Sequence, residues 1–237
     1  MIYYDLGKNI TAFTTDRTVG RNEGLLLTSL PVQASKLIYP HQTHTDKIAV
    51  IDEQMLSLSP VERKMRLEGI DAVLSNQCGV AIGISTADCI PVLIYDAEHH
   101  VAAAIHAGWK GTVQRIVEKT VAMMVKTYGT DVRCCKAAIG PGISQESFEV
   151  GQEVVDRFYA ADFPMEQYII QKKKPHIDLK AINRQQLIDN GVGEKDIFVS
   201  DVDTFTDERY FSARREQKPQ ADGTVIKCGR ILSGFVL

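Results

Sequence analysis

Residues 80–106 read VAIGISTADCIPVLIYDAEHHVAAAIH, and this stretch decides the fold class. It contains three apolar runs of six residues each, 80–85, 91–96 and 101–106, separated by short polar connections. Runs of this length that are rich in Val, Ile and Ala and are bounded by turn residues are typical of buried strands. The stretch therefore predicts three consecutive strands at the centre of a sheet.

The strongest helical pattern of the chain comes directly after these strands. Apolar residues recur at three- and four-residue steps from Val113 to Tyr128, and Gly129 supplies a C-terminal stop. Further strands are expected at 37–40, 47–51, 71–74, 136–139, 197–199 and 230–237, and further helices near Glu149 and after an N-cap at Asp178. Many strands with about three helices predict an α+β (mixed α/β) fold of layered mixed sheets flanked by helices.

The composition limits what kind of protein this is. The chain has 237 residues, 44% of them hydrophobic, and no linker interrupts it, so we expect a single domain over residues 1–237. A net charge of −3 gives no reason to expect nucleic acid as a partner, and no apolar run approaches the ~20 residues that cross a bilayer. Five cysteines without a secretory leader predict free thiols in the cytoplasm. Monomer and homodimer both stay open.

A cysteine placed between two distant histidines is the strongest chemical signal. The residues are His44, Cys89 and His106, and each is expected where an apolar run ends. Two imidazoles and one thiolate leave the fourth tetrahedral position of a zinc ion open, which is the pattern of a catalytic rather than a structural site. If the three side chains converge in space, the sequence predicts a metalloenzyme.

Cys89 has two other interpretations that the sequence leaves open. It can be a buried apolar residue without a function, or a nucleophile paired with His106 or His44 in a metal-free hydrolase. The preceding Asp88 can orient a ligating histidine, carry the proton of an activated water, or simply form a turn. His41 lies on the opposite face of an extended segment from His44, so both cannot easily bind one metal.

Three basic residues are candidates for binding an anionic substrate group. Arg17 lies in a polar N-terminal segment, Lys110 in the first turn of the strong helix, and Arg214 after an aromatic Phe211-Ser212-Ala213 stretch. Guanidinium groups are planar and permanently charged, which suits phosphate. The alternative is that each is an ordinary surface charge.

At these positions the chain resembles the YfiH/YlmD-like family. The matching segments are His41-Gln42-Thr43-His44-Thr45-Asp46, Thr86-Ala87-Asp88-Cys89-Ile90-Pro91-Val92 and Ala104-Ile105-His106-Ala107-Gly108-Trp109-Lys110, with later matches at 139–143, 148–151, 178–184 and 211–215. The resemblance covers nearly the whole chain. Ala-Asp-Cys and His-Ala-Gly-Trp in this order are specific motifs.

The resemblance implies zinc bound by His44, Cys89 and His106. It implies phosphorolysis of purine nucleosides (adenosine, inosine, guanosine and methylthioadenosine) and hydrolytic deamination of adenosine, with phosphate and nucleoside as small-molecule partners. Copper-dependent phenol oxidation, the laccase or polyphenol oxidase label of the family, is the alternative. Cysteines that the family often carries elsewhere are replaced here, which weakens a multicopper interpretation, and Arg17 matches the family's N-terminal Arg only with a one-residue shift. A zinc-stabilised binding protein without activity is a further alternative.

Overall fold

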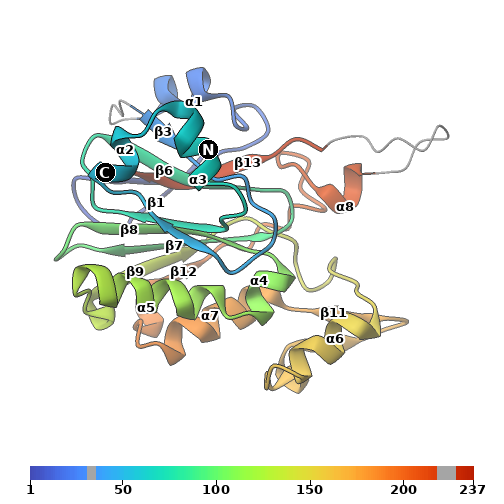
Figure 1. Cartoon of the computed structure of the whole chain (residues 1–237). Helices are drawn as coiled ribbons and strands as arrows, with labels where there is room; N and C mark the ends of the chain where they lie inside the picture. The colour runs from blue at the N-terminus through green and yellow to red at the C-terminus, as the bar shows by residue number, and fades with distance from the viewer. Residues whose placement is uncertain (31–35, 218–227) are drawn as a thin grey trace.

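The computed structural model describes residues 1–30, 36–217 and 228–237 of the chain. Two β-sheets lie one on the other, and helices cover the outer face of each (Figure 1). In the view of Figure 1, α1, α2 and α3 lie on the upper side and α5 and α7 on the lower side. The predicted α+β class with layered mixed sheets is therefore confirmed.

The three strands predicted from residues 80–106 all form, but they divide between the two sheets. β7 (Ile90–Asp96) and β8 (Val101–Ala107) pair antiparallel at the centre of a six-stranded sheet. β6 (Val80–Thr86) belongs to the five-stranded sheet. The chain therefore changes sheets across 87–89, the segment that carries Cys89.

Both sheets mix parallel and antiparallel pairs. The six-stranded sheet has the order β12 (Ile197–Val199), β9 (Cys135–Ile139), β7, β8, β5 (Ala72–Ser75) and β4 (Ile48–Val50). The five-stranded sheet has the order β1 (Ile2–Tyr4), β2 (Thr11–Thr14), β13 (Ile231–Val236), β6 and β3 (Lys36–Ile38). A separate antiparallel pair consists of β10 (Ile169–Gln171) and β11 (Pro175–Ile177).

Alternation along the central strands divides their side chains between two cores. On β7, Val92 and Ile94 face the helices, whereas Leu93 and Tyr95 face the other sheet. Because successive side chains of a strand point to opposite faces, a strand buried on both sides needs apolar residues throughout. This burial explains why the predicted strands read as continuous apolar runs.

The helices are α1 (Glu23–Ser29), α2 (Glu53–Ser57), α3 (Pro60–Arg66), α4 (Trp109–Val113), α5 (Ile116–Tyr128), α6 (Gln152–Tyr159), α7 (Leu179–Asp189) and α8 (Ala213–Glu216). Asp178 is the predicted N-cap of α7, since its side chain accepts a bond from the Ala181 amide at 2.9 Å. The expected helix from Val113 is interrupted, because Arg115 adopts a left-handed φ of 59° between α4 and α5. Lys110 therefore lies in the short α4.

No helix within residues 1–30, 36–217 and 228–237 is both long and apolar enough to cross a membrane.

Candidate metal centre and its pocket

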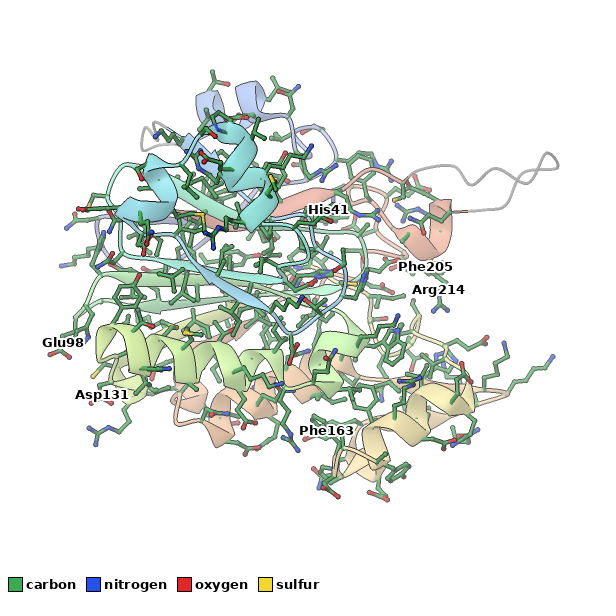
Figure 2. All side chains as sticks on the ribbon, viewed as in Figure 1. His41, Glu98, Asp131, Phe163, Phe205 and Arg214 are labelled. Carbon is green, nitrogen blue, oxygen red and sulfur yellow. The ribbon has the colours of Figure 1, made fainter. Side chains whose placement is uncertain are left out.

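The predicted ligands meet at one end of the stacked sheets. His106 is the next-to-last residue of β8, and Cys89 comes directly before β7. The β7–β8 register pairs Ile90 with Ala107 and Pro91 with His106, so it brings Cys89 to the end of β8. This end of the molecule also carries His41, Phe205 and Arg214, and the opposite end carries Glu98 and Asp131 (Figure 2).

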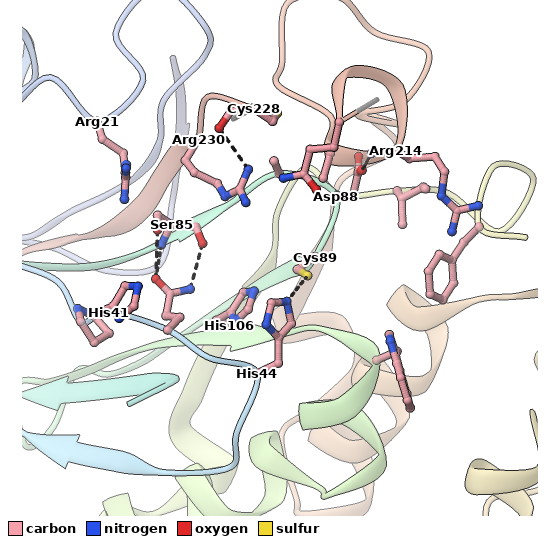
Figure 3. A pocket seen from close by; sticks show the side chains of 18 residues that line it. Arg21, His41, His44, Ser85, Asp88, Cys89, His106, Arg214, Cys228 and Arg230 are labelled. Atoms are coloured by element: carbon pink, nitrogen blue, oxygen red, sulfur yellow. Dashed lines mark hydrogen bonds between the residues drawn. The ribbon is translucent and has the colours of Figure 1, made fainter. Parts of the chain in front are cut away.

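The third ligand, His44, does not end a strand as the sequence suggested. It lies in the connection between β3 and β4, well after Ile38, and its backbone has a left-handed φ of 63°. Extended backbone would direct consecutive side chains to opposite faces, whereas this turn directs the His44 ring toward Cys89 (Figure 3).

The side chains of His44, Cys89 and His106 form a compact group of donors. One ligand atom from each lies within 4.8 Å of the others, and His44 Nε2 is 3.7 Å from Cys89 Sγ. A tetrahedral zinc site with bonds of about 2.0–2.3 Å places its ligand atoms roughly 3.3–3.8 Å apart. The donor types and their spacing therefore fit a zinc ion after small side-chain adjustments.

A carboxylate that the sequence analysis missed holds two of these ligands in place. Asp71 is fully buried, and its Oδ1 accepts the Nδ1–H of His106 at 2.6 Å and the His44 amide at 3.0 Å. Its Oδ2 accepts bonds from the amide and hydroxyl of Thr45 and from the Thr43 amide. With Nδ1 engaged, the Nε2 lone pair of His106 is the one left for a metal. The signal was present in the sequence as an acidic residue opening an apolar strand.

The local charges favour the ligating form of the cysteine. Burial disfavours the Cys89 thiolate, but the positive charge of His106 and hydrogen bonds from His106 and His44 outweigh it and lower the pKa of the thiol to about 6. Burial likewise opposes protonation of His106, whereas the Cys89 thiolate and Asp71 raise its pKa to about 9. At neutral pH the metal-free pair is therefore a thiolate beside an imidazolium. The thiolate is the form that binds metals, and a metal bound by His106 would replace the proton on Nε2.

Gly108 allows this close approach. A Cβ atom on Gly108 would lie 3.0 Å from Cys89 Sγ and 3.0 Å from Cδ2 of His44. The residue has an ordinary extended backbone, with φ −69° and ψ 166°, so space rather than conformation requires glycine there.

Asp88 does not orient a histidine. Its backbone is left-handed, with φ 82°. Oδ1 accepts a bond from the Thr204 hydroxyl at 2.7 Å, and Oδ2 accepts bonds from the Ser212 hydroxyl at 3.0 Å and the Arg214 amide at 2.7 Å. Asp88 therefore fastens the C-terminal segment around 204–214 beside Cys89. Of the roles left open for Asp88, orienting a histidine belongs to Asp71, and carrying a proton stays a prediction.

The ligand group lies in the wall of a cavity of about 810 Å³. Such a volume is within the range of small-molecule sites. Its other lining residues include aromatic, amide, thiol and cationic side chains: Arg21, Gln42, Trp109, Phe148, Arg214, Gln217, Cys228 and Arg230. The cluster is therefore accessible to a ligand, as a catalytic rather than a structural metal site requires.

The structure separates the three predicted anion-binding residues. Arg214 lines the cavity, and its Nη1 donates to the Glu149 carbonyl at 2.9 Å. Arg17 is outside the lining, because its guanidinium binds Glu216 and the carbonyls of Glu208 and Tyr210. Lys110 is exposed and also lies outside the lining.

Two other arginines, Arg21 and Arg230, line the cavity instead. The sequence analysis missed both, because neither lies near a motif with chemical meaning.

Comparison with known proteins matches residues 5–236 to the family described as multi-copper polyphenol oxidoreductase laccase. A purine nucleoside phosphorylase from Bacteroides thetaiotaomicron is 40% identical over 97% of this chain and 84% of its own. Adenosine deaminase RL5, from an unknown prokaryotic organism, is 40% identical over 80% of this chain and 74% of its own. The crystal structure of the hypothetical protein YfiH from Bacillus licheniformis superposes with a TM-score of 0.82 at 23% identity, covering 96% of this chain and 92% of that one. The chain therefore belongs to the YfiH/YlmD-like family, whose model carries the laccase description.

Proposed function

We propose that this protein is a zinc-dependent enzyme that cleaves purine nucleosides by phosphorolysis. The observation that carries the proposal is the His44–Cys89–His106 group, open to a cavity large enough for a nucleoside. The relatives named above supply the substrate class, because one is a purine nucleoside phosphorylase and another an adenosine deaminase. The expected substrates are adenosine, inosine, guanosine and methylthioadenosine.

His44, Cys89 and His106 would hold the metal, and zinc in such a site supplies a Lewis acid with one free coordination position. Asp71 keeps the His106 ring oriented by accepting its Nδ1–H at 2.6 Å. Asp88 keeps Arg214 at the cavity wall by binding its amide. The aromatic rings of Trp109 and Phe148 can pack against a purine base, which is a planar ligand.

Product analysis tests this proposal. Purified protein is incubated with inosine or adenosine, with and without phosphate, and the products are separated by chromatography. Free base that forms only when phosphate is present supports phosphorolysis. Absence of any nucleoside turnover by zinc-loaded protein would refute the proposal. A Cys89→Ser variant serves as the control for contaminating enzymes.

Hydrolytic deamination of adenosine is a second candidate, and the similarity to adenosine deaminase RL5 favours it. In this reaction water adds to the purine carbon that bears the amino group, and ammonia leaves to give inosine. Inosine formed from adenosine without phosphate identifies this activity in the same assay.

Copper-dependent phenol oxidation is a third candidate, favoured by the family description. Across the described ranges, one group of three His, Cys or acidic side chains has metal-binding spacing. Reduction of oxygen to water by a multicopper enzyme needs several copper centres, so this geometry favours zinc. Oxygen consumption that follows bound copper in the presence of a phenol would reverse this preference.

We place the enzyme in the cytoplasm, because all five of its cysteines are free thiols in the structure.

A further inference from the structure

The cavity beside the metal centre carries more positive than negative charge. Among the residues that the structure describes, Arg21, Arg214 and Arg230 line it, and Asp88 is the one carboxylate in the lining. That carboxylate already accepts three hydrogen bonds, described above. Because the whole chain has a net charge of −3, this local excess is not a consequence of composition. A cationic cavity in an acidic protein indicates an anionic ligand.

Arg21 and Arg230 come from segments that are fastened together. The hydroxyl of Thr15, which is fully buried, accepts the Leu232 amide at 2.8 Å and donates to the Gly20 carbonyl at 2.8 Å. Gly20 also lies against the backbone of Arg230, since a Cβ on it would be 3.3 Å from the Arg230 carbonyl oxygen. The two arginines therefore extend from neighbouring backbone positions.

Neither guanidinium is neutralised by a carboxylate in the described part of the chain. Arg230 donates through Nη1 to the Cys228 and Gly229 carbonyls, at 3.3 and 3.1 Å. Arg21 lies 5.9 Å from the centre of the Tyr39 ring. By contrast, Arg17 is paired with Glu216, and Arg133 with Asp131. Arg21 and Arg230 therefore keep donors for an anion that enters the cavity.

The two arginines lie on one side of the metal centre and Arg214 on the other. In Figure 3, Arg21 and Arg230 occupy the side of Ser85 and His41, to the left of His44 and Cys89, and Arg214 is to the right. Arg214 lies 5.7 Å from the centre of the Phe148 ring, so this second side is also the aromatic one. The cavity thus has one end with two arginines and one aromatic end with a single arginine, and the ligand group lies between them.

We propose that Arg21 and Arg230 bind the phosphate of the reaction and that the aromatic end receives the purine. This inference rests on the proposed function. In phosphorolysis a phosphate oxygen bonds to the ribose anomeric carbon while the bond from that carbon to purine N9 breaks, and N9 takes the phosphate proton. Nucleophile and leaving group lie on opposite sides of the carbon, which matches the two ends of the cavity. A phosphate group can come from inorganic phosphate or from a nucleoside monophosphate.

The test compares zinc-loaded wild type with Arg21→Ala, Arg230→Ala and the corresponding Lys variants. Calorimetry measures binding of inorganic phosphate and, separately, of AMP and adenosine, and steady-state assays give KM for phosphate and for inosine. Arg133→Ala is the matched control, because it removes an exposed guanidinium at the opposite end of the molecule. Circular dichroism and melting temperature establish that each variant is folded.

We expect each Ala substitution to raise Kd and KM for phosphate by about 10-fold or more, with partial recovery in the Lys variants and little change in KM for inosine. Weakened AMP binding, with inorganic phosphate and adenosine binding intact, would assign the same residues to a phosphate ester. Folded Ala variants that bind both inorganic phosphate and AMP like Arg133→Ala would overturn the inference. If wild type turns over no nucleoside, the proposed function fails, and the phosphate-binding measurements still decide the role of the arginines.

Discussion

Replacing Asp71 with Asn changes one buried oxygen into an amide nitrogen directly behind the metal ligands. Oδ1 accepts from His106 Nδ1 and the His44 amide, and Oδ2 accepts from the amides of Thr43 and Thr45 and the Thr45 hydroxyl. In either orientation the new NH₂ group faces donors. Asp71 is fully buried, so water cannot replace the lost bonds.

At least two donors then lose their acceptor, and each costs about 1–3 kcal/mol. We therefore expect Asp71→Asn to lower the free energy of unfolding by about 2–6 kcal/mol at neutral pH. Where the NH₂ group takes the place of Oδ1, the His106 ring is also no longer held with Nε2 toward the metal. Loss of such a partner typically lowers metal affinity by roughly 10- to 100-fold.

Chemical denaturation measures the first effect, and competition with a chromophoric zinc chelator measures the second. Asp88→Asn is the matched control, because Asp88 is also a buried carboxylate that accepts three bonds, but none of them from a ligand histidine. Asn tolerates the left-handed backbone at that position. We expect Asp88→Asn to lose stability while keeping zinc affinity. A folded Asp71→Asn protein that binds zinc within twofold of wild type would refute the reasoning.

Three further predictions concern the metal centre and its surroundings. Cys89→Ser replaces a thiolate with a hydroxyl that stays protonated, so zinc affinity should fall by more than the roughly 10- to 100-fold expected for Asp71→Asn, as the same chelator competition would measure. Gly108→Ala places a methyl group against Cys89 and His44, and we expect weaker zinc binding and about 1–3 kcal/mol of lost stability; unchanged values for both would contradict the steric argument. The pKa of Glu216 is held at about 2, since bonds from Arg17, Arg215 and Cys228 outweigh the effect of burial. Its stabilising contribution is present above the ordinary pKa and is lost as pH falls toward 2, so Glu216→Gln should flatten acid unfolding curves in that range.

The local sequence pattern was sufficient to predict the strands that are buried on both faces. The apolar runs at 80–85, 91–96 and 101–106 became β6, β7 and β8, because a strand between two layers buries both of its faces and therefore consists mainly of apolar residues. Helix α1 was not predicted, because its seven residues bury a single side chain, Leu26. Short helices with one buried residue leave no periodic signal.

The sequence alone identified His44, Cys89 and His106 as candidate metal ligands, because a thiol and two imidazoles in matching motifs are chemically distinctive at any separation, and the structure brings the three together. The sequence did not identify what holds them. Asp71 became the orienting carboxylate only because the β5–β8 pairing places it beside His106, and Arg21 joined Arg230 only because the N-terminal segment pairs with β13. Residue chemistry is encoded locally, whereas proximity between distant segments depends on strand register and sheet order, which no local pattern specifies.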